Sequence, residues 1–246
     1  MNGWVLGTDT SHWDGAINFN RMYSAGAKWW ITKATDAYRT TGQQFEDSRF
    51  NEYVLAASKT PLLKGCYHWL QASVDPTVAA DFYLERYNRY EFDFPAVLDF
   101  EETSVRQTGL FSDYAWRAQM WCKRVEEVTG RKPIIYTARW FTNYFTEQQI
   151  GWMREYPLWV AHYPWVVTSL TRPSIPPIWD KWTFWQFSAD GNGRGDEFGT
   201  QSKSVDLNYY QGSMGDLLTF LGMSEQPPEP LTLEERVKRL EKAVFG

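Results

Sequence analysis

The chain has 246 residues, of which 43% are hydrophobic and 22% are charged, so it can bury a sizeable core and is not intrinsically disordered over most of its length. Its net charge of −5 argues against a broad phosphate-binding surface, and therefore against nucleic acid as a partner. Aromatic residues make up 17% of the chain, which indicates a core of large rings or a surface that binds flat ligands.

Short apolar runs alternate with helical patterns along most of the chain. Because strands that alternate with helices form a mainly parallel sheet, we predict an α/β fold with helices covering the sheet. Eight strands favour a closed TIM-like (β/α) barrel. The first predicted strand is not followed by a glycine-rich phosphate-binding turn, which argues against a dinucleotide cofactor. The predicted strands are 4–8, 29–32, 62–70, 96–100, 134–137, 158–162, 182–187 and 205–209.

Three segments between these strands have clear helical patterns. The first spans about 43–58. The second follows Asp75, an N-cap residue, with Pro76 at the first helical position. The third begins at a Ser112 cap, carries an apolar stripe and ends at Gly130.

The pattern becomes irregular late in the chain. Residues 164–180 contain several prolines and 189–199 are rich in Gly and Asp, so we predict loops there and a barrel with incomplete helices on that side. A helix at about 213–221 completes the main folded domain over 1–223. A stiff Pro-rich linker follows at 224–230, then a short amphipathic helix at 231–246. That helix could self-associate as a coiled coil and make a homo-oligomer, act as a spacer, or dock on the barrel.

Targeting and redox signals are sparse. No apolar run is long enough to cross a membrane, and no secretory signal opens the chain, so we expect synthesis in the cytoplasm. Cys66 and Cys122 lie in apolar segments, which favours two buried free thiols over a disulfide, and their spacing fits no zinc site.

Polar residues end most of the predicted strands, which is where parallel barrels place their active sites. Four acidic residues at or near strand ends should lie close together at one barrel mouth. These candidates are Asp9, Asp99, Glu101 and Asp206.

The pair Asp99 and Glu101, in the segment AVLDFEE, is the sharpest of these features. Residues two apart on a strand face the same side, with Cα atoms roughly 6.5 Å apart. Two facing carboxyls repel, which raises one pKa and leaves a protonated acid beside an ionised partner. That arrangement can protonate a glycosidic oxygen while stabilising positive charge on the sugar. The alternatives for this pair are a metal site and a solvated strand end. A magnesium site would need a phosphate-cradling loop, which the sequence does not contain. We therefore expect no metal or cofactor.

Aromatic residues divide into two groups. Trp4, Trp30, Trp121 and Trp182 fit a core. Rings at strand ends and loops could stack on the apolar faces of sugars. Of these rings, we take Trp69, Tyr163 and Trp185 as substrate-binding candidates, and we add Gln186, which ends the seventh strand. The three histidines have no nucleophile context, which argues against a hydrolase triad.

Eight ordered segments of the chain resemble glycoside hydrolase family 25, the Chalaropsis-type lysozymes or N-acetylmuramidases found among phage endolysins. The segments are GTDTSHWDG, WWITKATD, GCYHW, AVLDFEE, IIYT, PLWVAHY, WTFWQFS and VDLNYY, and they run from about residue 3 to 221. The resemblance implies an irregular eight-stranded barrel and hydrolysis of the β-1,4 bond between N-acetylmuramic acid and N-acetylglucosamine. It also implies bacterial peptidoglycan as the partner, reached from the cytoplasm by a phage endolysin or a released enzyme.

The resemblance also implies roles for individual residues. Glu101 would be the general acid, and Asp99 would position or charge-stabilise the 2-acetamido group or the oxocarbenium centre. Of these routes we favour participation of the acetamido group over direct attack by water. Asp9 and Asp206 would complete the acidic cluster. Lys33, Tyr67 and Tyr136 match positions that line the family's groove. The chain departs from the family at Asp14 and Asp36, where members often carry Gln and Glu.

Two other functions stay open from the sequence. A family 18 chitinase-like enzyme also places an Asp-x-Glu motif on its fourth strand, but its fuller pattern needs Asp where this chain has Phe94 and Val97. A non-catalytic sugar-binding barrel would have no need for the like-charged pair Asp99 and Glu101.

Overall fold

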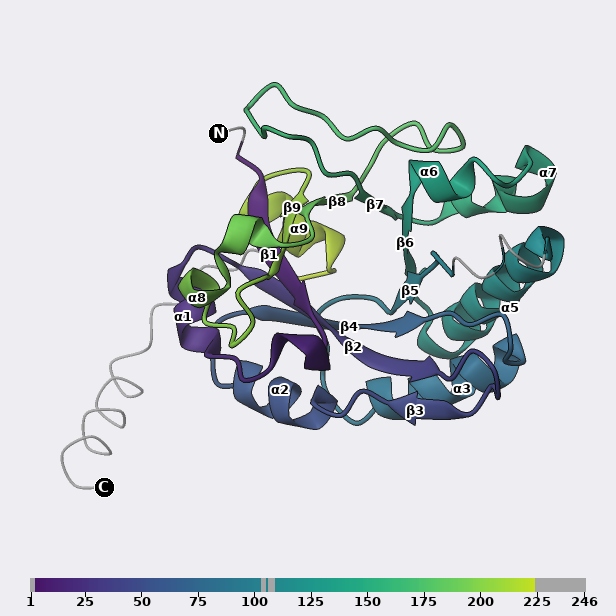
Figure 1. Cartoon of the computed structure of the whole chain (residues 1–246), viewed down its shortest axis with the longest axis horizontal. Coiled ribbons are helices and arrows are strands. Elements are labelled where there is room, and N and C mark those ends of the chain that lie inside the picture. Colours follow the sequence, from purple (N-terminus) through teal and green to yellow (C-terminus); the bar gives the residue numbers. More distant parts are fainter. Residues whose placement is uncertain (1–2, 103–104, 106–108, 224–246) are drawn as a thin grey trace.

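The computed structural model describes residues 3–102, 105 and 109–223. Eight of its strands close into a barrel, in which β1 pairs with β2 at one side and with β9 at the other (Figure 1). Around the barrel the strands follow the order β1-β9-β8-β7-β6-β5-β4-β2. The strands are β1 Val5–Thr10, β2 Trp29–Ala37, β4 Leu63–Trp69, β5 Val97–Asp99, β6 Ile134–Ala138, β7 Leu158–Ala161, β8 Phe184–Ser188 and β9 Asp206–Tyr210.

Each of the eight predicted strands is present, but one of them runs the opposite way. The neighbours from β1 through β2 and β4 to β8 are parallel, whereas β9 is antiparallel to both β1 and β8. A ninth, short strand, β3 (Gln44–Glu46), pairs antiparallel with β2 outside the barrel. The irregular TIM-like barrel expected from the sequence is therefore confirmed.

Helices cover the outside of the barrel unevenly. Figure 1 shows α2, α3 and α5 packed along one side, while the connection from β7 to β8 has no long helix. The bounds are α1 Phe19–Ser24, α2 Phe50–Ala57, α3 Pro76–Tyr87, α5 Phe111–Thr129, α6 Arg139–Thr142, α7 Glu147–Ile150, α8 Gly195–Phe198 and α9 Met214–Phe220, with 3₁₀ turns at η1 His12–Asp14, η2 Gly151–Glu155 and η3 Gly191–Gly193.

The helix ends agree only partly with the sequence predictions. The Asp75 side chain accepts backbone N–H groups at the start of α3, and Gly130 ends α5 in the left-handed region at φ 67°. The prediction of one helix over 43–58 is wrong, because its first part pairs with β2 as β3 and only α2 is helical. Ser112 is not a cap, since α5 begins one residue earlier, and 189–199 contains η3 and α8 rather than loop alone.

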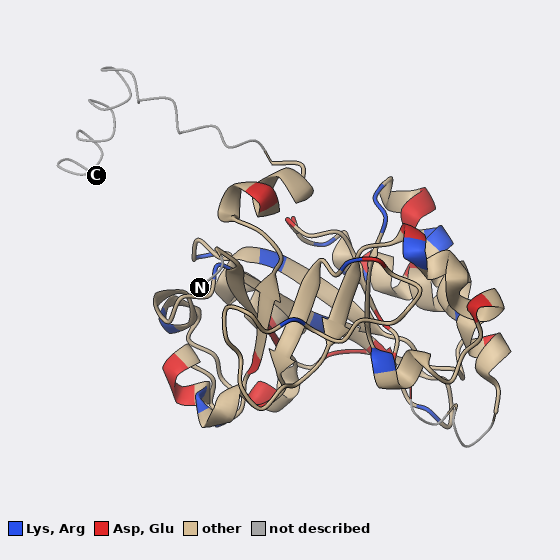
Figure 2. Ribbon diagram, turned by 90° about the horizontal axis from the view of Figure 1, so that it is seen from above, with Lys and Arg blue, Asp and Glu red and all other residues tan. Residues whose placement is uncertain are grey.

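Charged residues are interspersed on the outer helices and loops, while most of the strand ribbon is uncharged (Figure 2). None of the helices in the described ranges is long and apolar enough to cross a membrane. The predicted linker at 224–230 and the helix at 231–246 lie outside the described residues.

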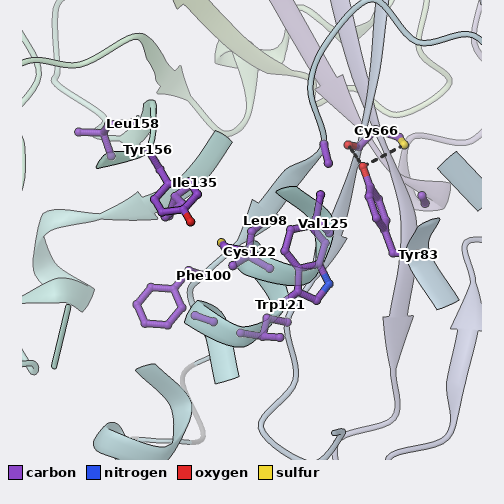
Figure 3. Packing of buried hydrophobic residues seen from close by; sticks show 14 of the residues in the cluster. Cys66, Tyr83, Leu98, Phe100, Trp121, Cys122, Val125, Ile135, Tyr156 and Leu158 are labelled. Carbon is purple, nitrogen blue, oxygen red and sulfur yellow. Dashed lines mark hydrogen bonds between the residues drawn. The ribbon is translucent and has the colours of Figure 1, made fainter. Parts of the chain in front are cut away.

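The apolar side chains form two cores separated by the strands. The outer core lies between the barrel and its helices. It includes Trp121, Leu98 and both cysteines, which are buried and free (Figure 3). There the Tyr83 hydroxyl donates to the Cys66 carbonyl oxygen at 2.8 Å. Packing in the core accounts for much of the high aromatic content of the chain, because the outer core alone contains several fully buried aromatic side chains.

The inner core fills the end of the barrel opposite the polar strand ends. Trp29, Phe94 and Phe184 meet there with ring centroids 5.3 to 5.8 Å apart. Gly7 on β1 makes room for this packing, because a Cβ atom at that position would lie 2.1 Å from the Trp29 ring. Side chains therefore fill this end of the barrel, and a pocket lies near the polar ends of the strands.

Candidate active site

Alternation along the strands carries polar side chains to one end of the barrel. On β1 the inward positions are Val5, Gly7 and Asp9, so the strand changes from apolar to acidic as it approaches the mouth. Because β9 runs in the opposite direction, its first residue, Asp206, reaches the same mouth and its last, Tyr210, lies in the inner core. The reversed strand therefore places Asp206 beside the ends of the parallel strands.

A narrow pocket of about 70 Å³ opens at this mouth. It is small against the roughly 300–1,000 Å³ of pockets that enclose a ligand, so it admits a substituent rather than a whole disaccharide. All four predicted acids line it, together with most of the predicted aromatic residues. Its lining is Asp9, Tyr67, Trp69, Val97, Asp99, Glu101, Tyr136, Trp159, Gln186 and Asp206.

Gln186 on β8 organises one wall of this pocket. Its Oε1 accepts from the hydroxyls of Tyr136, at 2.7 Å, and Tyr163. Its Nε2 donates to Asp9 Oδ2 at 2.9 Å and to Asp206 Oδ2 at 3.2 Å. Since its carbonyl oxygen and its amide nitrogen are both engaged by protein groups, Gln186 fixes the positions of the two acids.

Asn208 and Trp159, which are not among the residues predicted from the sequence, belong to the same network. Asn208 Nδ2 donates to Asp9 Oδ2 at 2.7 Å, and Trp159 Nε1 donates to Asn208 Oδ1 at 2.9 Å. The spacing of Asp206 and Asn208 on β9 could have indicated this, because residues two apart on a strand face the same side.

Burial and like charges raise the pKa values of the four acids. For Glu101 the pKa rises to about 7, first because of burial and then because of the negative charge of Asp9. For Asp99 it rises well above its usual range, through burial and then repulsion by Glu101. Burial likewise raises the pKa of Asp9 and of Asp206. The cluster therefore retains protons at neutral pH.

Asp14, one of the departures from the family pattern, lies close to the cluster. Its pKa is raised to about 7, mainly by burial and in part by Asp9 and Asp47. It is the third residue of η1 and accepts from the backbone N–H of the N-cap residue Ser11 at 2.8 Å, in a capping box that fixes its side chain. Its negative charge also raises the pKa of Asp206.

Lys33 supplies a cation that acts on two members of this acidic group. Its Nζ forms a buried ion pair with Asp36 and lies 4.8 Å from the centre of the Trp69 ring. The Lys33 charge lowers the pKa of both Asp99 and Glu101, against the effect of burial. Asp36 also accepts from Gln71 Nε2 at 2.9 Å, so the lysine is held by a fixed partner.

Two of the predicted substrate-binding aromatics lie outside the pocket. The prediction for Trp185 is wrong, because its ring is fully buried in the outer core and its Nε1 donates to the His162 carbonyl oxygen. Alternation along β8 turns Gln186 inward and therefore Trp185 outward. Tyr163 is 51% exposed and touches the network only through its hydroxyl. In the part of the chain that the structure describes, no group of three or more His, Cys, Asp or Glu side chains could hold a metal ion.

Comparison with known proteins agrees with this geometry. A family model described as glycosyl hydrolases family 25 matches residues 8–196. The chain belongs to this family. It is 32% identical to Lysozyme M1 of Streptomyces globisporus, over 87% of this chain and 70% of that protein. It is also 32% identical to the uncharacterized protein YegX of Escherichia coli K12, over 91% of this chain and 76% of that protein.

The fold matches the same family. The crystal structure of the bacterial lysozyme from Streptomyces coelicolor has a TM-score of 0.71 and 28% identity, with 88% of this chain and 96% of that chain covered. The family 25 resemblance is thus confirmed, the chain is a glycoside hydrolase, and the chitinase-like alternative is excluded.

Proposed function

We propose that the protein is a muramidase that hydrolyses the β-1,4 bond between N-acetylmuramic acid and N-acetylglucosamine in bacterial peptidoglycan. The observation that carries this proposal is the position of Glu101: a carboxyl with a pKa raised to about 7, at the mouth of a family 25 barrel, among three other acids. An acid with that pKa holds a proton near neutral pH and can still give it up.

In the proposed first step, Glu101 donates its proton to the glycosidic oxygen as the bond between that oxygen and C1 breaks. Asp99 accepts the N–H of the 2-acetamido group, whose carbonyl oxygen attacks C1 and forms an oxazolinium ring. Asp99 suits this role because its Oδ1 is buried and has no hydrogen-bond partner among the described residues. The small pocket fits such a substituent.

In the second step, the Glu101 carboxylate removes a proton from water, which attacks C1 and reopens the ring. Two displacements at C1 return the original anomeric configuration, so this route predicts retention. Asp9 and Asp206, held by Gln186, share one proton, and the negative charge that remains on Asp9 lies near the positive charge that develops on the sugar. Trp69, Tyr67 and Tyr136 provide the aromatic walls of the pocket.

The test is clearance of a cell-wall suspension by Glu101→Gln beside a control, Glu127→Gln, which removes one equally negative but exposed side chain on α5. We expect Glu101→Gln to lower kcat at least about a hundredfold, as for loss of a general acid, and the control to match the parent. If Glu101→Gln clears walls at the parent rate, the catalytic role is wrong. If the parent binds walls without releasing reducing ends, the protein is a sugar-binding barrel.

The reaction course needs a separate measurement. Proton NMR of the first product from a defined muropeptide should show the β anomer before mutarotation. An α anomer as the first product would exclude acetamido participation and would indicate direct attack by water instead.

A further inference from the structure

A second hollow, of about 350 Å³, lies beside the catalytic pocket. Its walls come from α6, the end of β7 and the connection from β7 to β8, which passes near α6 in Figure 1. The residues that matter here are Arg139, Trp140, Asn143, His162, Tyr163 and Ser174.

Tyr163 joins the two sites. Its ring lines the hollow, while its hydroxyl donates to Gln186 Oε1, which also accepts from Tyr136 in the catalytic pocket. A ligand group in the hollow would therefore lie one aromatic ring away from the catalytic network.

Arg139 gives the hollow its charge. The side chain is exposed, and Nη1 donates to Ser174 Oγ at 3.1 Å, which ties the guanidinium to the opposite wall. Arg154 and Arg194 pair with Glu147 and Glu197, but Arg139 forms no ion pair with any carboxylate of the described residues. Its remaining N–H groups are thus available to a planar anion such as a carboxylate.

The rest of the hollow suits a short peptide. Trp140 and Tyr163 are 49% and 51% exposed, so both rings present apolar surface in the hollow that Arg139 also lines. Asn143 adds an exposed amide that can bind backbone groups. The catalytic pocket is unsuitable for a carboxylate, because four acids already crowd it.

We propose that this hollow is a subsite for the stem peptide of peptidoglycan, with Arg139 binding one of its carboxylates. The inference rests on the proposed muramidase function, since muramic acid carries this peptide beside the bond to be cleaved. A protein of net charge −5 gains no long-range attraction to an anionic wall, so a local cation that meets the substrate's carboxylate supplies affinity at the point of contact.

The experiment measures kcat/KM on three preparations of glycan strands. The first carries intact stem peptides, the second has their carboxyl groups converted to amides, and the third has been stripped of peptides by an amidase, which leaves the lactyl carboxylate. We expect Arg139→Ala to lower kcat/KM about tenfold on the first, mainly through KM, and to leave the other two unchanged. Arg139→Lys should lie between, because it keeps the charge without the planar fork.

Arg124→Ala is the control, because it removes one half-buried arginine of α5, away from the hollow, where it pairs with Asp81 and Glu127, and it should match the parent on all three preparations. An equal loss for Arg139→Ala on stripped strands would overturn the stem-peptide assignment and place the lactyl carboxylate there. No loss on intact strands would overturn the subsite altogether. A parent protein that cleaves none of the three would instead refute the proposed function.

Discussion

Asp9 on β1 and Asp206 on β9 face each other across an antiparallel pair of strands, and their carboxyls share a hydrogen bond. Asp9 is the acceptor in this pair, because Gln186 and Asn208 both donate to it at 2.9 and 2.7 Å, whereas Asp206 accepts from Gln186 at 3.2 Å, so Asp206 keeps the proton. The two acids are therefore chemically different although the sequence shows them as equivalents.

This difference predicts unequal effects of the two amide substitutions. Asp206→Asn replaces one donor by another and should lower kcat/KM by about tenfold at most. Asp9→Asn gives three donors a single accepting oxygen, so we expect a loss of about a hundredfold and roughly 2 kcal/mol of stability. Steady-state kinetics and urea unfolding measure both. Equal losses, or a larger loss for Asp206→Asn, would contradict the assigned roles.

Activity should fall as pH rises through about 7, because Glu101 must hold its proton to act as the acid. Asp9→Asn removes a negative charge that raises the Glu101 pKa, so its alkaline limb should move to lower pH. Asp206→Asn should leave that limb in place. A pH profile of kcat/KM for the parent and the two variants makes the comparison. If the alkaline limb of Asp9→Asn lies at the same pH as that of the parent, the Asp9 charge does not raise the Glu101 pKa.

Replacing Lys33 should move the same limb in the opposite direction. The Lys33 cation lowers the pKa of Glu101 and Asp99, so Lys33→Met should raise the Glu101 pKa and extend activity to higher pH. It should also lower kcat/KM, because Asp36 loses its ion-pair partner and Trp69 its cation. Lys132→Met, an exposed lysine elsewhere on the barrel, serves as the control and should leave the profile unchanged.

Glu101→Gln should stabilise the protein at alkaline pH. The folded-state pKa of about 7 lies above the ordinary 4.5, so the folded protein binds more protons than the unfolded chain between these values. Stability from this group is therefore present at low pH and lost as pH rises toward 7. We expect Glu101→Gln to be about 3 kcal/mol more stable than the parent at pH 8 and similar at pH 4. Urea unfolding at both pH values is the measurement, and a gain of the same size at pH 4 would contradict this cause.

Much of the site could be predicted from the sequence, because a strand and the polar residue that ends it are visible within a few neighbouring positions of the chain. Asp99 and Glu101 stand after an apolar run, and the ends of parallel strands meet at one barrel mouth whatever the details of the helices. The sequence does not show that Trp185 faces outward, because the choice between the two faces of β8 depends on register, and a shift of one residue exchanges them. The region 43–58 failed for a similar reason, since β3 exists only through its pairing with β2.

By itself, the sequence determined the number and place of the barrel strands and the acids at their ends, because hydrophobic alternation is a local property of the chain. Only the tertiary structure decided how deeply each acid is buried, which of them holds a proton and which residues they contact. Asp206 lies opposite Asp9 because β9 reverses direction, and their bonds to Gln186 join residues 177 and 20 positions apart. Burial and charge proximity set a pKa, and both arise only when distant segments pack together.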